Sequence, residues 1–288
     1  MRIRKAVLPV AGLGTRVLPA TKVVPKELLP IVDKPTLQYI VEEAAGAGIE
    51  EMIFVTSRSK RAIEDHFDAF PELEQTLERK GKHNELEELR RIQQLAKYAV
   101  VRQVEPLGLG HAVLCAKELV GDEPFVVMLG DEIYPHEPCL QSLMEAYERH
   151  HSSILTLVTV QREQISSYGI ASVKEQDGRT FQVTDLIEKP KPAEAPSNLA
   201  VAGRYVITPD IFALIEKLPP GRGGEIQLTD ALQIQARQAR CHGIHFVGQR
   251  YDMGTPLGLL TTSIALGLQR SDIAPALREY MHQTLKTE

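Results

Sequence analysis

The chain has 288 residues, of which 43% are hydrophobic and 25% charged, which is the composition of a globular protein large enough to bury a full core. Its formal net charge of −5 at pH 7 argues against sequence-independent binding to nucleic acid. No apolar stretch approaches the roughly 20 residues that a membrane-spanning helix needs, so we expect a cytoplasmic protein that binds neither nucleic acid nor membrane.

The first predicted strand, residues 6–10, opens into a turn of small residues and then a lysine-containing segment. Glycine has no Cβ, so the main-chain N–H groups of such a turn can come within hydrogen-bonding distance of phosphate oxygens. Arginine and lysine side chains nearby add positive charge and donors. The sequence therefore predicts a polyanion site formed by Ala11, Gly12, Leu13, Gly14, Thr15 and Arg16, followed by Lys22, Lys26 and Glu27.

Two well-known phosphate-binding loops do not match this segment. A Walker-type loop requires Gly-x-x-x-x-Gly-Lys-Ser/Thr, whereas Gly14 is followed by Thr15 and Arg16. A dinucleotide fingerprint requires a third glycine three residues after Gly14, whereas Val17 stands there and Pro19 soon follows. Both alternatives are therefore excluded by spacing.

Alternating helices and strands follow the turn, which indicates an α/β protein with parallel strands and right-handed crossovers. Thr36 is expected to cap a helix over residues 37–47. The charged segment 72–97 is expected to be one long helix or a helical hairpin, and to serve as a solvated helix face or as a subunit-contact arm. The other elements predicted in this half are strands over 52–56, 98–103, 125–129 and 154–160, and helices over 59–67, 112–117 and 140–150.

The clearest buried strand, residues 125–129, runs directly into Gly130 and Asp131. Ligands of α/β sheets bind beyond the carboxyl ends of the strands. Asp131 is therefore a candidate ligand-binding carboxylate, with the alternative that it caps a turn or a helix.

From about residue 166 the sequence changes to shorter β-type segments that are separated by turns. Strands are predicted over 169–174, 181–188, 200–208 and 243–248. Residues 219–224 form a flexible linker, and residues 225–230 form a motif to which we assign no chemical role. Helices are predicted over 209–218, from residue 229 or 230 to 240, over 256–268 and over 274–286.

Other catalytic or metal-binding patterns are missing from the sequence. The three cysteines, Cys115, Cys139 and Cys241, fit neither a disulfide framework nor a zinc pattern, so we expect reduced thiols. The nine histidines show no metal-ligand spacing, and the sequence has neither a Gly-x-Ser-x-Gly elbow nor a catalytic-cysteine signature.

The combination of Gly-x-Gly-Thr-Arg with Pro-Lys-Glu-Leu-Leu-Pro over residues 25–30 resembles the sugar-nucleotide pyrophosphorylases, or nucleotidyltransferases. Ala11 and the run Leu-Pro-Ala-Thr-Lys over residues 18–22 are similar to the bacterial UTP–glucose-1-phosphate uridylyltransferases in particular. The resemblance implies the transfer of a uridylyl group from UTP to glucose 1-phosphate, which gives UDP-glucose and pyrophosphate. UTP and glucose 1-phosphate are then the expected substrates, and Mg²⁺ the expected cofactor.

The resemblance also assigns roles to individual residues. Arg16, Lys26 and Lys189 match catalytic residues that stabilise phosphate charge, and Asp131 and Asp252 match the two magnesium-binding aspartates. Glu132 stands where the family usually has a second aspartate, so no metal role is assigned to it. The expected nucleotide-binding residues are Ala11, Gly12, Leu13, Gly14, Thr15 and Glu27, with Gln103 and Gly108 facing uracil. The expected sugar-phosphate-binding residues are Gly169, Glu188, Lys189 and Gly203.

The resemblance covers nearly the whole chain and implies the nucleotidyltransferase type A fold. This is an α/β fold with a Rossmann-like, mixed and mainly parallel central sheet flanked by helices, a small β-rich sugar-binding part and C-terminal helices. We expect one domain over 1–288, with a nucleotide-binding half over 1–150 and a sugar-phosphate-binding half over 151–255. The C-terminal helices over 256–288 would contribute to the contacts of a homodimer or homotetramer.

Two alternatives stay open. A thymidylyltransferase that uses dTTP would need little change, because uracil and thymine differ by one methyl group and no residue visibly excludes it. A non-catalytic regulatory paralogue would bind nucleotide or an active partner subunit. Such paralogues tend to lose the Thr-Arg pair of the phosphate turn, whereas Thr15 and Arg16 are both present here.

Overall fold

The computed structural model describes residues 2–135 and 138–286 of the protein. Residues 1, 136–137 and 287–288, which belong to the expected nucleotide-binding half and C-terminal segment, lie outside the described residues. The main strands are β1 (Lys5–Pro9), β4 (Glu51–Thr56), β5 (Lys97–Arg102), β6 (Phe125–Met128), β8 (Ser153–Thr159), β9 (Gly169–Asp177), β10 (Thr180–Glu188), β11 (Leu199–Ile207) and β12 (Cys241–His245). Within the described residues they form one nine-stranded sheet in the order β5-β4-β1-β6-β11-β8-β12-β10-β9.

Parallel and antiparallel pairs divide this sheet into two regions. Strands β5, β4, β1 and β6 run parallel to one another. Beyond β6, strand β11 is antiparallel to both β6 and β8, β12 is parallel to β8, and β10 is antiparallel to β12 and β9. The expected mixed sheet is confirmed. Because the carboxyl ends of the four parallel strands meet at one edge, the loops that follow them lie together there.

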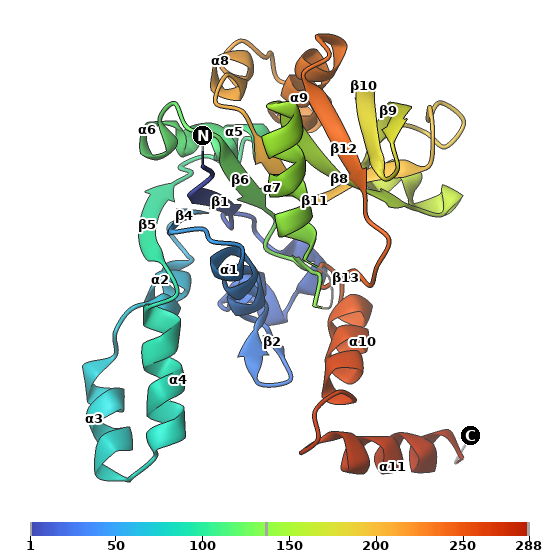
Figure 1. Cartoon of the computed structure of the whole chain (residues 1–288). Helices are drawn as coiled ribbons and strands as arrows, with labels where there is room; N and C mark the ends of the chain where they lie inside the picture. The colour runs from blue at the N-terminus through green and yellow to red at the C-terminus, as the bar shows by residue number, and fades with distance from the viewer. Residues whose placement is uncertain (1, 136–137, 287–288) are drawn as a thin grey trace.

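Helices cover both faces of the sheet (Figure 1). Alternate residues of β1 point to opposite faces: Ala6 and Leu8 pack with α1 and α7 in one apolar cluster, and Val7 packs with α5, α8 and α9 in another. The helices are α1 (Thr36–Gly46), α2 (Arg61–Phe67), α3 (Pro71–Arg79), α4 (His83–Gln93), α5 (Leu109–Cys115), α6 (Lys117–Val120), α7 (Cys139–His150), α8 (Ile211–Ile215), α9 (Leu228–Arg237), α10 (Pro256–Gly267) and α11 (Ala274–Leu285).

Short elements connect the sheet to the loops at its carboxyl edge. Two small ribbons pair β2 (Pro30–Ile31) with β3 (Lys34–Pro35), and β7 (Glu132–Ile133) with β13 (Tyr251–Asp252). Three single 3-10 turns, η1 (Thr15–Val17), η2 (Ala20–Lys22) and η3 (Lys26–Leu28), follow β1. Two further 3-10 turns, η4 (Arg162–Ser167) and η5 (Arg222–Gly224), lie later in the chain.

The predicted elements are present with shifted bounds: the helix predicted over 209–218 spans only Ile211–Ile215, and the strand predicted over 243–248 is Cys241–His245. One open alternative is decided, and two details are corrected. The charged segment is a hairpin of α3 and α4, which projects away from the sheet (Figure 1). Thr36 does not cap α1, because it is already inside the helix and its hydroxyl donates to the carbonyl of Leu29. Helix α9 ends at Arg237 rather than at Arg240, because Ala239 adopts a left-handed backbone with φ 56°.

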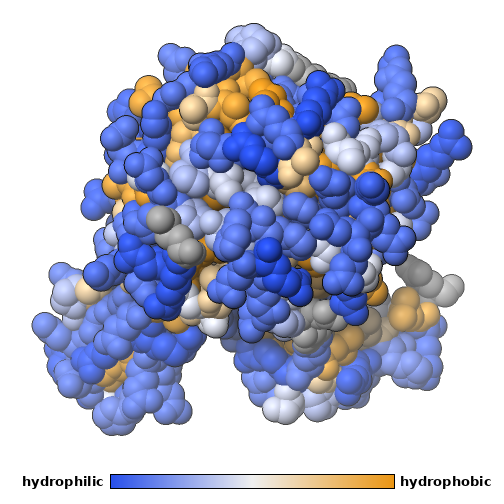
Figure 2. All heavy atoms as spheres, turned by 45° about the horizontal axis from the view of Figure 1, so that its top comes forward, coloured by the Kyte–Doolittle hydropathy of each residue, from blue (hydrophilic) through white to orange (hydrophobic). Residues whose placement is uncertain are grey.

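The surface is mainly polar. In the view of Figure 2 hydrophilic residues make up most of the visible face, and hydrophobic residues reach the surface in separate patches. Among the described residues, no helix combines the length and the apolar character that crossing a membrane would require.

Candidate functional site

The predicted phosphate turn leaves the sheet directly after β1. The N–H group of Val10 still donates to the carbonyl of Val55, and the chain then turns through Gly14, whose φ of 66° lies in the left-handed region that glycine adopts without strain. The hydroxyl of Thr21 donates to the carbonyl of Gly14 over 2.8 Å and holds the turn against η2. Gly12, Leu13, Thr15 and Arg16 are exposed, so the turn presents its backbone and its arginine to solvent.

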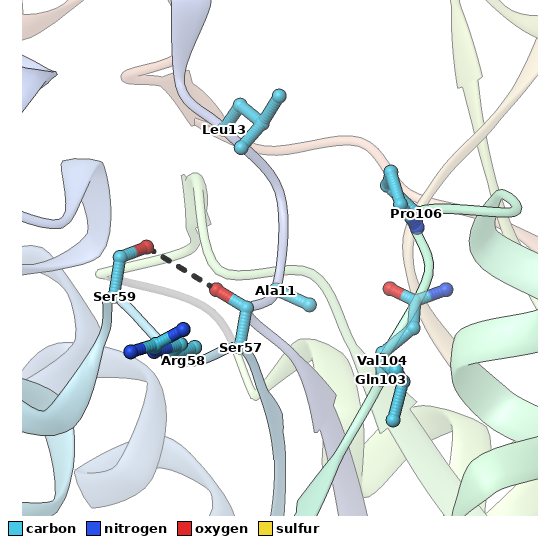
Figure 3. A pocket seen from close by; sticks show the side chains of 8 residues that line it. All are labelled: Ala11, Leu13, Ser57, Arg58, Ser59, Gln103, Val104 and Pro106. Carbon is cyan, nitrogen blue, oxygen red and sulfur yellow. Dashed lines mark hydrogen bonds between the residues drawn. The ribbon is translucent and has the colours of Figure 1, made fainter.

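Two cavities of similar size flank the turn. The first cavity has about 410 Å³ and lies between the ends of β4 and β5. Figure 3 shows Gln103 and Pro106 on one side of it, Ser57 to Ser59 on the other, and Ala11 between them. The second cavity has about 400 Å³ and brings together residues predicted from segments far apart in the sequence: Arg16, Asp131, Gly169, Glu188, Lys189 and Asp252.

An ion cluster connects the turn to Asp131. The ammonium of Lys26 lies 2.6 Å from a carboxylate oxygen of Asp131, and the guanidinium of Arg16 lies 3.6 Å from the same oxygen. Burial alone would raise the pKa of Asp131, but Lys26 and Arg16 outweigh it and the pKa is lowered. Burial alone would lower the pKa of Lys26, but Asp131 and Glu27 outweigh it and the pKa is raised. Both groups are therefore charged at neutral pH.

Glu27 lies beneath the turn rather than in either cavity. Its side chain is 1% exposed, and the ammonium of Lys60 donates to it over 2.7 Å. Burial raises the pKa of Glu27 and lowers that of Lys60. A Cβ at Gly130 would lie 2.9 Å from Cγ of Glu27, so the absence of a side chain there makes room for this carboxylate. The structure thus places Glu27 as a support of the turn, because its carboxylate is already occupied by a buried lysine.

The backbone around Asp131 is fixed from two sides. Glu132 pairs with Asp252 in the β7–β13 ribbon, and the N–H group of Met253 donates to the carbonyl of Asp131 over 2.8 Å. On the side of the sheet, the fully buried Arg204 of β11 donates to the carbonyl of Glu132 over 2.8 Å and pairs with Glu43 of α1. These contacts bring Asp131 and Asp252 to the wall of one cavity.

Asp131 and Asp252 have the chemistry expected of a magnesium site that the substrate completes. Mg²⁺ in phosphate-transfer sites is usually held by one or two carboxylates together with phosphate oxygens and water. Both carboxylates line the second cavity, and one oxygen of Asp252 accepts a hydrogen bond from the N–H group of Gly254 over 2.8 Å. Within residues 2–135 and 138–286, no three histidine, cysteine or acidic side chains gather as a metal-binding group.

The opposite wall of the second cavity comes from the ends of β9 and β10. Gly169 pairs with Glu188 in the antiparallel ladder. One carboxylate oxygen of Glu188 accepts from the hydroxyl of Thr229 over 2.7 Å, and the other lies 2.9 Å from the ammonium of Lys189. Lys189 has a φ of 45°, and its N–H group donates to the carbonyl of Tyr168. A carboxylate and an ammonium thus lie side by side where a sugar hydroxyl and a phosphate could bind.

Gly203, which is expected to bind the sugar, does not itself line either cavity. A Cβ at this position would lie 3.0 Å from Cβ of Leu129 and 3.2 Å from the carboxyl carbon of Glu132. The N–H group of Gly203 donates to Glu132 over 3.1 Å. The missing side chain therefore makes room for residues of the protein itself.

Of the two expected base-reading residues, Gln103 lines the first cavity, and Gly108 contacts Gln103 without lining it. The amide nitrogen of Gln103 donates to the carbonyl of Gly108 over 3.0 Å, and its amide oxygen faces the cavity (Figure 3). Gly108 has a φ of 97°, and a Cβ there would lie 2.7 Å from Cβ of Glu225. The loop that holds Gln103 is thus packed against the start of the 225–230 motif, which gives that motif a structural role.

Several residues of the two cavities were missed by the sequence analysis. Ser57 and Arg58 line the first cavity, and the rule that ligands bind at the carboxyl ends of parallel strands could have found them, since they follow β4. Thr229 and Tyr168 line the second cavity. Neither belongs to a pattern with a known chemical role, because their place depends on tertiary contacts with Glu188 and Arg250.

Comparison with known proteins agrees with this geometry. The family described as "Nucleotidyl transferase" matches residues 5–267. A UTP–glucose-1-phosphate uridylyltransferase of Bacillus subtilis is 51% identical over 288 residues, which is 100% of this chain and 99% of that protein. A second uridylyltransferase of this name, from Staphylococcus saprophyticus, is 49% identical over 97% of both chains.

Solved structures show the same fold. A UDP-glucose pyrophosphorylase complexed with UDP-glucose has a TM-score of 0.86 at 42% identity and covers 93% of this chain and 100% of that one. The UTP-bound UGPase from Acinetobacter baumannii has a TM-score of 0.90 at 39% identity, over 97% and 99%. These similarities extend over nearly the full length of both partners, and we conclude that this chain belongs to the nucleotidyl transferase family.

Proposed function

We propose that the protein transfers a uridylyl group from UTP to glucose 1-phosphate and releases pyrophosphate. The observation that carries the proposal is the meeting of Arg16, Asp131, Asp252, Glu188 and Lys189 around one cavity of about 400 Å³, with Lys26 paired to Asp131. The cationic side chains suit the phosphates of the nucleotide, and the two aspartates suit a metal ion. Glu188 suits the hydroxyl groups of the sugar, and Lys189 suits its phosphate. The sequence identity of about half with enzymes named for this reaction supports the choice of substrates.

The chemistry needs positioning and charge neutralisation more than acid–base catalysis. The attacking group is a phosphate oxygen that is already ionised at pH 7, so neither a general base nor a protein nucleophile is required. Lys189 would hold this phosphate, and Arg16 and Lys26 would stabilise the triphosphate and the departing pyrophosphate. Mg²⁺ held by Asp131 and Asp252 would neutralise charge on the substrate phosphate oxygens.

The proposal divides the chain by task. Residues 1–150 would bind the nucleotide, with Gln103 at the edge of the uracil, and residues 151–255 would bind the sugar phosphate, within one domain. Residues 256–288 would contribute to oligomer contacts: Leu257 and Leu260 of α10 are 70% and 59% exposed, and such large apolar side chains are suited to a subunit interface. Light scattering on the purified protein tests for the homodimer or homotetramer.

The direct test is pyrophosphate release with five nucleotides, each paired with glucose 1-phosphate and titrated with Mg²⁺. The proposal predicts rapid release with UTP and little release with dTTP, CTP, ATP or GTP. Faster release with dTTP would move the assignment to a thymidylyltransferase with the same mechanism. No release with any pair would favour the regulatory paralogue and contradict the proposal.

A further inference from the structure

Arg250 connects the two walls of the second cavity without lining it. Its guanidinium lies 3.2 Å from a carboxylate oxygen of Glu132, and a second nitrogen donates to the hydroxyl of Tyr168 over 3.1 Å. The same guanidinium lies over the ring of Tyr168, 5.3 Å from its centre. Glu132 and Tyr168 both line the cavity, whereas Arg250 lies behind them. An arginine in this place can act on the site only through its two partners.

Glu132 belongs to the wall that holds the predicted metal carboxylates. It follows Asp131 directly and faces Asp252 across the β7–β13 ribbon, which has only two residues in each strand. A ribbon this short has little stability of its own. The side chain of Glu132 fixes it, because one carboxylate oxygen accepts from Tyr134 over 2.9 Å and from the N–H group of Gly203 over 3.1 Å, and the other faces Arg250.

Tyr168 belongs to the opposite wall. It directly precedes Gly169, and its carbonyl accepts from the N–H group of Lys189 over 3.0 Å. Lys189 adopts a left-handed backbone with φ 45°, which is rare for a residue with a side chain and persists only where its surroundings hold it. The position of Tyr168 therefore bears on the position of the expected sugar-phosphate lysine.

We propose that Glu132, Arg250 and Tyr168 form a positioning relay that holds the sugar-phosphate wall at a fixed distance from the metal-carboxylate wall. The inference rests on the proposed function, since it assumes that glucose 1-phosphate binds between these walls. None of the three residues is assigned a chemical step. The side chains of Arg250 and Glu132 are only 15% and 8% exposed, so solvent weakens their electrostatic attraction little. The link between them is therefore suited to hold the two walls in place.

The relay is tested by binding in the presence of EDTA, which removes any contribution of a metal. Calorimetry would compare UDP-glucose with UDP, which lacks the sugar, on the wild type and on Arg250→Met. We expect Arg250→Met to lower the affinity for UDP-glucose about tenfold, which is the effect of one lost charged hydrogen bond. The affinity for UDP should change less than about twofold. With Mg²⁺ present, the KM for glucose 1-phosphate should rise while the KM for UTP stays within twofold.

Four further variants keep the test decisive. Arg237→Met removes an arginine from an exposed pair with Asp185 and should leave both affinities unchanged. Glu132→Gln keeps an acceptor for Tyr134 and Gly203 but loses the charge that faces Arg250, so it should reproduce the selective loss. The double variant should bind UDP-glucose no more weakly than the more affected single variant, because both changes break the same link. Arg250→Lys should recover part of the loss and replaces Arg250→Met if that variant does not fold.

The outcomes separate the relay from the proposed function. If the wild type binds UDP-glucose and the variants lose affinity for UDP and UDP-glucose equally, or lose affinity for neither, the relay is wrong and the proposed function stands. If the wild type binds UDP-glucose no more tightly than UDP, the proposed function is wrong and the relay is overturned with it. A selective and non-additive loss supports both.

Discussion

At the scale of single residues, the site depends on groups that hold their charge in a partly buried place. Asp131 and Lys26 stabilise one another, since the pKa of the acid is lowered and that of the lysine is raised. Under the proposal both have a second partner, the metal for Asp131 and the triphosphate for Lys26. Lys189 likewise has a partner within the protein, Glu188, and under the proposal would also meet the phosphate of the sugar.

Asp131→Asn tests the metal assignment. The amide keeps the size of the side chain but loses the negative charge, so we expect Mg²⁺-dependent turnover to fall at least about 100-fold. The measurement is the rate of pyrophosphate release over a range of Mg²⁺ concentrations. Asp122→Asn, at an exposed position, is the matched control. A magnesium titration of Asp131→Asn that superimposes on that of the wild type would disprove the assignment.

Lys189→Ala tests the sugar-phosphate assignment. Loss of a charged hydrogen-bond donor is expected to lower kcat/KM for glucose 1-phosphate about 10- to 100-fold and to change the KM for UTP little. Steady-state kinetics with each substrate varied in turn measure this. Lys191→Ala, which removes an 82% exposed lysine two residues further on, should behave as the wild type. Wild-type kinetics in Lys189→Ala would rule out the assigned role.

At the scale of elements, the site is built where short turns leave a rigid sheet. Arg204 of β11 illustrates how the sheet supports them: it is fully buried, pairs with Glu43 of α1 and donates to the carbonyls of Gly203 and Glu132. One side chain thus joins a strand, a helix and the turn that carries Asp131. Stability and the placement of Asp131 are coupled at this residue.

Arg204→Met should therefore destabilise the whole protein. It removes one partner of a buried ion pair and takes the Arg204 donors away from the carboxylate of Glu43 and the carbonyl of Glu132, which we expect to cost about 3–5 kcal/mol. Urea unfolding followed by circular dichroism measures the loss. Arg237→Met breaks an exposed pair and should change the free energy of unfolding by less than about 1 kcal/mol. Equal losses in the two variants would show that Arg204 has no special role.

The elements also show what a sequence can and cannot predict. The phosphate turn and Asp131 were placed correctly at the sheet edge because each directly follows an apolar strand, which is a local signal. Arg250 and Tyr168 are 82 residues apart and have no local pattern, so their contact becomes visible only in the folded chain. The contacts of Gly203 with Glu132 and of Glu27 with Lys60 could not be predicted for a related reason, because the motif does not tell which side chain of the protein itself occupies the nearby space. The binding roles expected of these two residues stay predictions.

At the scale of the whole molecule, two projections frame the sheet (Figure 1). The α3–α4 hairpin extends from one side and α10 with α11 from the other. The parallel strands and their flanking helices could be predicted because helix and strand signals alternate along the sequence, whereas the mixed sheet was implied only by the family resemblance. The hairpin could not be told from one long helix, since Gly81 interrupts the charged segment with a φ of 65° that the sequence pattern does not reveal.

Buried histidines make the stability of the molecule depend on pH. His242 is 6% exposed, lies 2.7 Å from the hydroxyl of Ser152, and stacks on His150. Burial, together with the neighbouring His150, lowers the pKa of His242, and burial lowers that of His66. As the pH falls through the ordinary histidine pKa of about 6.5, the unfolded chain therefore takes up protons that the folded chain does not bind, and the free energy of unfolding decreases.

This dependence predicts a lower melting temperature at pH 5.5 than at pH 7. His242→Asn keeps a polar group near Ser152 but cannot titrate, so its melting temperature should fall less over the same interval. His282→Asn, at an exposed position, should follow the wild type. An unchanged pH dependence in His242→Asn would exclude this histidine as a cause.

The most direct measurement follows radioactive phosphorus from UTP in the presence and absence of glucose 1-phosphate. We expect the α-phosphorus label to move into UDP-glucose and the γ-phosphorus label into pyrophosphate, and both transfers to require glucose 1-phosphate and Mg²⁺. If the labels stay in UTP, or appear in UDP and inorganic phosphate regardless of the sugar phosphate, the cavity does not join these two substrates and the proposed function is wrong.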